Sequence, residues 1–316
     1  MRWIAGLLAC LIATTAQAQL QCSQVKLVVP YPAGGATDVA ARLVAEKLEP
    51  ALKKSVVIEN RAGATGNIGT AAVATSPGDG CTLLVNAAVI ATFQTSFSKL
   101  TYDPIKDLIP VGGIGITPTL LVTASANPPT NLKGLVDWSK TKPDGLNYAT
   151  AGYGLLQHLA IEEMGQRLKA KFVHVVYKGG AQATVDLITA RVDFGSFAAG
   201  SVLPLVKEGK LKAIGVVQEK RSALVPDVPT TVEQGLPGLN AGVHFLIFAP
   251  AATPKNVVTV LSDELKKVVG DPTLRDRFLS IGFDPTPTSS DEMIQIMRRT
   301  NEDWSPVIKR LNIKLD

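Results

Sequence analysis

The amino-acid sequence predicts an α/β protein of two lobes, each a mostly parallel sheet flanked by helices, joined by two crossing segments. Four times the chain reads apolar strand, glycine-bearing turn and helix, an alternation typical of parallel sheets with helices on their faces. Turn-rich connections follow the second and the fourth of these units. The 316 residues, 46% hydrophobic and 19% charged, are enough for two cores of the usual domain size.

The first residues have the pattern of a secretory signal peptide. A basic start at Arg2 precedes an apolar run over residues 3–15, and Ala16-Gln17-Ala18 is a small-x-small cleavage signal. We expect a signal peptide over residues 1–18, cleaved after Ala18. The apolar run is too short to span a bilayer, and no later segment reaches the roughly twenty apolar residues that spanning needs. The sequence therefore predicts an exported, soluble protein of the periplasm.

The strand-turn-helix units follow in order along the mature chain. They span residues 26–48, 56–74, 146–164 and 172–190. In the first, Val39, Leu43 and Leu48 form an apolar stripe at helical spacing. The connection 123–145, rich in Pro, Asn, Thr and Lys, is expected to carry the chain between lobes and to feed a short helix at 132–139.

The second crossing is expected in the turn-rich segment 226–254, which ends in an apolar strand. Beyond Pro254 the apolar spacing is helical. We assign residues 19–119 to the first part of lobe 1, residues 120–241 to lobe 2, and residues 242–316 to the return into lobe 1.

Charge and aromatic content argue against nucleic acid as a partner. The net charge is +5 and aromatic residues make up 5% of the chain, with Lys and Arg scattered, so neither a basic stripe nor a stacking platform is present. The small positive net charge indicates only weak attraction for anions.

Two cysteines remain after removal of the signal peptide, Cys22 and Cys81. Each stands just before an apolar run, so in adjacent parallel strands the two would lie near the same edge. A disulfide is then geometrically feasible in an oxidising compartment. Two independent small apolar side chains fit the sequence equally well.

The loops that follow the strands are suited to hold an anion. Ligands of open α/β sheets bind outside the carboxyl ends of the strands, where helix starts present unpaired N–H groups and partial positive charge. In "PYPAGGATD" the glycines let the backbone approach a ligand. Thr37 can cap the helix or donate to a carboxylate. Asp38 favours the helix dipole but competes with a bound anion.

Similar loops recur further along. "NRAGATGNIG" is neither a dinucleotide fingerprint nor a phosphate loop, so no cofactor is predicted. Asn67 can bind a ligand or cap its helix. In the second lobe, "ATAGYGLLQH" offers Thr150, Gly152 and Gly154, and "YKGGAQA" offers Gly179, Gly180 and Lys178, which can pair with a carboxylate or remain solvated.

Catalytic patterns are missing from the sequence. His158, His174 and His244 lack the close spacing of a zinc site, so we predict no metal. No GxSxG motif occurs, and Cys81 has no base nearby in sequence. We predict no enzymatic activity, with a hydrolase or transferase acting on small acids as the less favoured alternative. His158 and His244 are candidate cleft residues.

Seven stretches occur in order along nearly the whole mature chain: "VPYPAGGATDVAARLVAEKL", "VVIENRAGATGNIG", "LTYDPIKDLIPVG", "LNYATAGYGLLQHLA", "HVVYKGGAQATVDLITARVDF", "LVKEGKLKAIGVVQEKRSALVPDVPTTVEQGLPG" and "FLIFAPAATP". Together they resemble the extracytoplasmic solute receptors of tripartite tricarboxylate transporters, the Bug family. The resemblance implies a two-lobed periplasmic binding protein, type II-like and monomeric, that closes on a small organic anion. A di- or tricarboxylate, an amino acid or an aromatic acid would be delivered to a membrane permease, or sensed on behalf of a sensor kinase.

The resemblance also implies which residues bind the ligand. A carboxylate is held at the first-lobe loop, and the other contacts come from later loops. The implied residues are Tyr31, Pro32, Ala33, Gly34, Gly35, Thr37, Asp38, Gly66, Asn67, Ala87, Ala88, Thr150, Gly152, Gly154, Gly179, Gly180, Phe197 and Ala198. Two positions depart from the family. Cys81 stands where relatives often carry an aromatic residue, which suggests a local disulfide, and His244 lies near a position where Trp or another aromatic residue is common.

Overall fold

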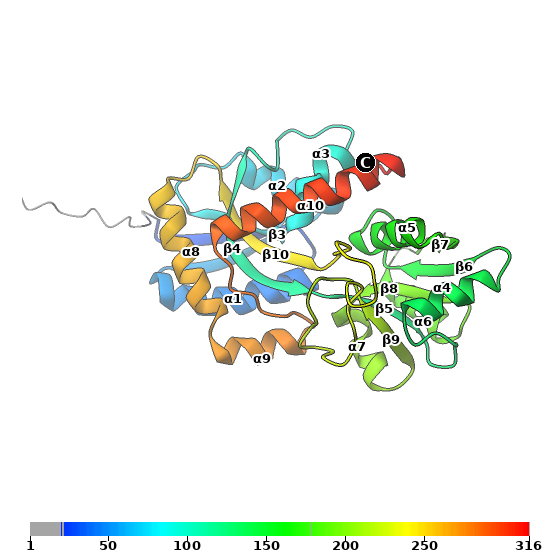
Figure 1. Ribbon diagram of the computed structural model, residues 1–316. Helices are drawn as coiled ribbons and strands as arrows, with labels where there is room; N and C mark the ends of the chain where they lie inside the picture. Colours follow the sequence, from blue (N-terminus) through cyan, green and yellow to red (C-terminus); the bar gives the residue numbers. More distant parts are fainter. Residues whose placement is uncertain (1–19, 21, 178, 316) are drawn as a thin grey trace, which may run out of the picture.

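Two five-stranded sheets form the frame of the molecule (Figure 1). The computed structural model describes residues 20, 22–177 and 179–315, so the predicted signal peptide and Lys178 lie outside the described residues. The first sheet has the order β2 (Ser55–Asn60), β1 (Gln24–Val29), β3 (Thr82–Ala87), β10 (Val243–Pro250) and β4 (Leu108–Thr117). The second has the order β7 (Phe172–Val175), β6 (Leu146–Thr150), β8 (Phe194–Ala198), β5 (Thr119–Ala124) and β9 (Leu211–Val216).

Both sheets follow one pattern of strand directions. Their first three strands are parallel, and the fourth, β10 or β5, runs antiparallel to both of its neighbours. The mostly parallel sheets agree with the prediction. The strands are rich in Val, Ile and Leu because helices cover both faces.

Helices cover the first sheet on two sides. One face packs on α1 (Ala36–Leu52), α8 (Lys255–Val269) and α9 (Pro272–Ser280). The other packs on α2 (Asn67–Ala74), the 3-10 turn η2 (Ala88–Thr92), α3 (Phe93–Ser96) and α10 (Ser290–Arg310). A short 3-10 turn, η1 (Ala64–Gly66), precedes α2.

The second sheet is covered in the same way. One face carries α4 (Leu132–Lys140) and α5 (Leu156–Leu168), and the other carries α6 (Gly180–Ile188) and α7 (Ala199–Lys207). The end of α10 reaches across to α5, where Trp304, Val307 and Ile308 enter the core of the second lobe (Figure 1). No helix among the described residues has the length and apolar character that crossing a bilayer needs.

The chain passes between the sheets at Pro118, between β4 and β5. The passage expected in the connection 123–145 was therefore placed too late, because β5 already pairs within the second sheet and α4 packs there. The chain returns between Val216 and Val243. The predicted lobe boundaries, 19–119, 120–241 and 242–316, stay a prediction.

This passage turns the carboxyl ends of the two sheets toward each other. Strand β4 runs in the same direction as β3, because β10 is antiparallel to both. After Pro118, β5 begins beside the end of β8, where Thr119 pairs with Ala198. The carboxyl ends of β3 and β8 therefore lie on the facing edges of the two sheets, which are joined here by the single residue Pro118 between β4 and β5.

Cys22 and Cys81 form a disulfide with a Cα separation of 6.0 Å. They precede the adjacent parallel strands β1 and β3, and the Lys26 N–H donates to the Cys81 carbonyl at 2.8 Å. The bridge thus ties together the starts of two central strands, at the edge away from the second lobe.

Candidate ligand-binding site

Five helices begin at the facing edges without a side-chain cap. Their N-cap residues are Gly35 for α1, Gly66 for α2, Leu155 for α5, Gly179 for α6 and Ala198 for α7. Three of the four long helices that begin elsewhere in the described chain are capped by a side chain: α4 by Asn131, α9 by Asp271 and α10 by Ser289. The N–H groups of helix starts without such caps are available to a bound anion.

Asp38 shapes the loop before α1. Its carboxylate, only 1% exposed, accepts from the Gly34 N–H at 2.9 Å, from Arg42 at 2.9 and 3.1 Å, and from the Asn60 amide at 2.9 Å. Burial opposes ionisation, but these bonds outweigh it and lower the pKa of Asp38 to about 2. Asp38 is therefore a permanent anion that uses its oxygens to hold the loop.

A chain of hydrogen bonds joins the three loops of the first sheet. The Tyr31 hydroxyl donates to Asn86 Oδ1 at 3.2 Å, Asn86 Nδ2 donates to Thr70 Oγ1 at 3.0 Å, and the Thr70 hydroxyl donates to the Gly66 carbonyl at 2.7 Å. Burial raises the pKa of Tyr31 to about 12, so its hydroxyl keeps the proton. Asn67, which follows Gly66, has a buried Oδ1 that finds no hydrogen-bond partner among the described residues.

Gly66 fits this arrangement because it has no side chain. Its φ is +88°, and a Cβ there would lie 3.2 Å from the Tyr31 ring. Ala87 and Ala88, which follow β3, are buried, while Pro32, Ala33, Gly34 and Gly35 are exposed and Thr37 is buried. The structure thus brings the predicted first-lobe residues to one edge of the first sheet.

A stack of four rings lies beneath the Thr150–Gly154 loop of the second sheet. His158 and His174, sixteen residues apart, stack with centroids 4.3 Å apart, and Tyr148 and Tyr153 flank them at 4.7 and 4.9 Å. Thr150 Oγ1 lies 3.0 Å from His174 Nε2, and the Gly154 N–H donates to His158 Nδ1 at 3.2 Å. Burial lowers the pKa of both histidines to about 4, so both are neutral.

The other predicted residues of the second lobe that the structure describes lie in the loop after β7 and at the end of β8. Gly179 and Gly180 are half-buried, and nothing lies within 4 Å of a Cβ built at Gly179. The Phe197 ring is fully buried in the core between the sheet and α6 and α7. It therefore belongs to this core and does not face the space between the sheets. Ala198 is half-buried, and the Ala199 N–H that follows it donates to the Pro118 carbonyl at 2.8 Å.

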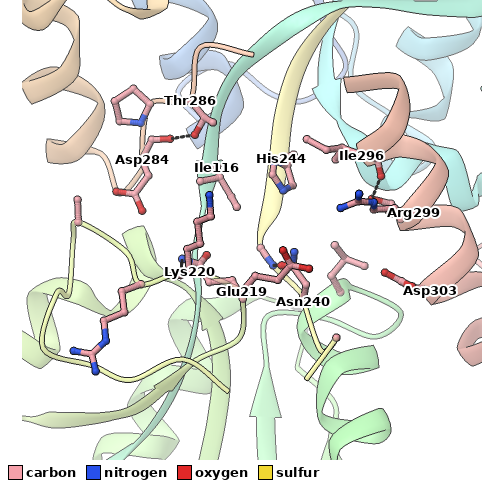
Figure 2. A pocket seen from close by; sticks show the side chains of 18 of the residues that line it. Ile116, Glu219, Lys220, Asn240, His244, Asp284, Thr286, Ile296, Arg299 and Asp303 are labelled. Carbon is pink, nitrogen blue, oxygen red and sulfur yellow. Dashed lines mark hydrogen bonds between the residues drawn. The ribbon is translucent and has the colours of Figure 1, made fainter. Parts of the chain in front are cut away.

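His244 lies beside the end of β3, because its neighbour Phe245 pairs with Ala87. It lines a cavity of about 740 Å³ at the β10–β4 end of the first sheet, together with the crossing segments and α10 (Figure 2). The loops that carry the predicted first-lobe residues follow β1, β2 and β3, and β3 is the strand next to β10. We call this space the hinge cavity; it is lined by residues of 116, 156, 218–223, 238–244, 275–286 and 296–304.

Sequence reasoning missed Asn86, Thr70 and His174. Each is a polar side chain within an apolar strand or in the first helical turns after one, and that placement is the signal that could have identified them. A buried polar group in such a place needs a partner, and here the partners are residues of the site.

These features are those of a two-lobed solute-binding protein, with the loops that are predicted to bind the ligand at facing sheet edges. A family model described as "Tripartite tricarboxylate transporter family receptor" matches residues 40–313, and the chain belongs to this family. It is a solute-binding receptor and not an enzyme. Its structural neighbours are likewise periplasmic solute-binding proteins.

Relatives match over most of their length. BugT of Bordetella pertussis is 31% identical over 293 residues, which cover 92% of this chain and 90% of BugT. Among solved structures, a TctC solute-binding protein from Polaromonas has a TM-score of 0.82 at 25% identity, covering 91% of this chain and 98% of that one.

Two further solved structures contain ligands. An R. palustris protein with adipate has a TM-score of 0.76 at 31% identity, covering 90% of this chain and 96% of that one. MatC from Rhodopseudomonas palustris with bound malate has a TM-score of 0.72 at 30% identity, covering 90% and 98%.

Proposed function

We propose that this receptor captures a small organic carboxylate between its two sheets in the periplasm and delivers it to the permease of a tripartite tricarboxylate transporter. The observation that carries the proposal is the set of five facing helix starts without side-chain caps. The adipate and malate bound by two relatives support a carboxylate as the ligand. Family membership supports delivery to a transporter.

The chemistry of binding follows from the loops. The ligand carboxylate meets backbone N–H groups at the start of α1, beside the Tyr31 hydroxyl. Closure of the second lobe excludes water, which strengthens these hydrogen bonds because the local dielectric falls. Closure is favoured only to the extent that the ligand binds the closed state better than the open one.

A thermal-shift screen tests the ligand class. The protein is unfolded and refolded to remove carried-over ligand, then screened against di- and tricarboxylates, amino acids, aromatic acids, sugars and cations. A carboxylate at ~100 times its Kd stabilises the fold by ~2.7 kcal/mol, which raises the melting temperature measurably. If sugars or cations shift the melt and no carboxylate does, the proposal is wrong.

A variant of Gly35 tests the position of the site. Gly35 has an ordinary φ of −72°, and a Cβ there would meet only the Pro32 carbonyl, at 3.4 Å. Gly35→Asp therefore folds, caps α1 with its own carboxylate and repels an anion. We expect it to abolish carboxylate binding, whereas Gly35→Ala, with no charge, keeps most of the affinity. Equal binding by the two variants would place the site elsewhere.

Export and delivery need their own measurements. We propose cleavage after Ala18 and a monomeric mature protein. The mass of the periplasmic form and its light-scattering molar mass test these statements. Uptake of the identified carboxylate by cells with and without the receptor gene tests delivery, and unchanged uptake would leave sensing as the role of the bound ligand.

A further inference from the structure

The hinge cavity adjoins the proposed carboxylate site, because Leu156 at the start of α5 and His244 both line it. It opens where β4 ends and β10 begins, between the crossing segments on one side and α9 and α10 on the other (Figure 2). Of all the residues predicted to bind the carboxylate, only His244 lines it. Its size and its distance in the sheet order from β1 and β2 make it a second candidate binding site.

Three buried polar atoms of this cavity have no hydrogen-bond partner among the described residues: Gln218 Oε1, Asp284 Oδ1 and His244 Nδ1. Gln218 is only 5% exposed, and its Nε2 donates to the Lys220 carbonyl at 2.7 Å, which fixes the other atom as the oxygen. Asp284 Oδ2 accepts from the Ser222 hydroxyl at 2.6 Å. Burial raises the pKa of Asp284. While Asp284 is ionised, both unpartnered oxygens can only accept, so an occupant that supplies donors satisfies them and favours the ionised form.

The cavity also offers cations without a close ion pair, although Asp284 and Asp303 line it too and interact electrostatically with Arg275 and Arg299. Lys220, Arg275 and Arg299 line it and form no ion pair among the described residues. Arg221, by contrast, pairs with Glu233 at 3.0 Å. Figure 2 shows Lys220 and Arg299 extending into the space from the crossing segment and from α10. The same cavity therefore presents both unpaired acceptors and unpaired cations.

We propose that the hinge cavity binds a small zwitterion, an α-amino acid in its ammonium carboxylate form. Its ammonium group supplies the donors that the oxygens of Gln218 and Asp284 lack. Its carboxylate lies against Lys220 or Arg299. A simple anion would leave the two oxygens unsatisfied, and a simple cation would leave the basic side chains unpaired.

The position of the cavity allows such a ligand to affect the equilibrium between open and closed lobes. Residues 218–223 and 238–242 belong to the segment that returns from the second sheet to the first, and Ile116 precedes the passage at Pro118. Hinge motions are absorbed by a few residues in segments of this kind. An occupant contacts them directly, so it changes the equilibrium between open and closed lobes in addition to filling the cavity.

Isothermal titration calorimetry tests the proposal on the full mature chain carrying Gly35→Asp, which keeps carboxylates out of the other site. The probes are glycine, L-serine, L-alanine, L-leucine, L-glutamine and L-methionine, with acetate and methylammonium as single-charge controls. We expect at least one amino acid to bind with 1:1 stoichiometry and neither control to bind at the same concentrations. Asp284→Asn and Gln218→Leu should each weaken that binding by tenfold or more.

Matched controls separate binding from folding. Asp276→Asn removes a carboxylate from an exposed position of α9 and should leave the amino acid affinity unchanged. Asp284→Asn keeps the size of the side chain, and in an otherwise wild-type chain it should bind carboxylates normally. The proposal is overturned if no amino acid binds, which would mean that water alone fills the cavity, if acetate binds as well as the amino acids, or if both cavity variants bind them as tightly as their parent.

Discussion

Asp38 is the residue on which the first binding loop depends. Asp38→Asn keeps its size but removes the charge that four donors share. Since hydrogen bonds to a charged group contribute about 1.5–3 kcal/mol each, we expect a loss of about 2 kcal/mol in the free energy of unfolding, measured in urea. Ligand affinity should fall as well, because the Gly34 N–H is released.

Arg42 is the natural control for this prediction. Its side chain is half-exposed, whereas the side chain of Asp38 is buried. Arg42→Ala should therefore cost under ~1 kcal/mol. A larger loss for Arg42→Ala than for Asp38→Asn would show that the ion pair, and not the loop hydrogen bonds, stabilises this region.

The stacked histidines predict a pH dependence. Burial lowers the folded pKa of His158 and His174 to about 4, against about 6.5 in the unfolded chain. The unfolded state therefore binds more protons between these values, and stability rises with pH. The contribution is fully present above pH 6.5 and is lost as the pH falls toward 4.

Urea unfolding between pH 7 and pH 4.5 measures this loss. The double variant His158→Gln/His174→Gln should start less stable at pH 7, because the ring stack is gone, but should lose less stability on acidification. The variant His244→Gln gives the contribution of the third buried histidine, whose pKa is also lowered to about 4 by burial. Parallel pH profiles for the wild type and the double variant would contradict the assignment.

At the scale of elements, α10 is the helix that joins the two cores. Its first half packs on the first sheet through Met293 and Met297, and its last turns place Trp304 in the core of the second lobe. Trp304→Ala removes a large side chain that is 3% exposed, so we expect a loss of about 3–5 kcal/mol in urea unfolding. Glu302→Ala, on the exposed face of α10, should cost within ~0.5 kcal/mol.

The disulfide acts on a different pair of elements. It closes a loop of 59 residues between the starts of β1 and β3, and chain-entropy arguments give about 4 kcal/mol for a loop of that size. The double variant Cys22→Ser/Cys81→Ser should lose a comparable free energy of unfolding. Added reductant should then destabilise the wild type and leave the double variant unchanged.

Much of the element pattern could be predicted from the sequence because each signal is local. Glycines after an apolar run predict a turn into a helix, and the loops before α1, α2, α5 and α6 lie where that pattern put them. The partners of these loops could not be predicted in the same way. Asn86 meets Tyr31 across 55 residues of sequence, and His158 meets His174 only because β6 and β7 are neighbours.

At the scale of the whole molecule, the sequence predicts two lobes, but its two indications of the first crossing disagree: a lobe boundary after residue 119 and the turn-rich connection 123–145. The Pro- and Asn-rich composition of the connection 123–145 predicts the first passage there. The chain instead crosses at Pro118, between two strands of largely apolar sequence. A strand that leaves one sheet and a strand that enters the next have the same local pattern, and only their pairing separates them. The bridging by α10 likewise depends on tertiary packing.

This arrangement predicts closure as the global response to a ligand. The sheets are linked by Pro118, by the return segment and by the end of α10, while their binding edges face each other. A carboxylate that contacts both edges favours the closed state, so the radius of gyration measured by small-angle X-ray scattering should fall when the screened ligand is added. Gly35→Asp should show no such change, since it does not bind, and Gly35→Ala should contract like the wild type. A wild-type radius that stays constant at saturating ligand, with binding verified by calorimetry, would mean that the lobes are already fixed in their bound arrangement and that affinity comes from a preformed site.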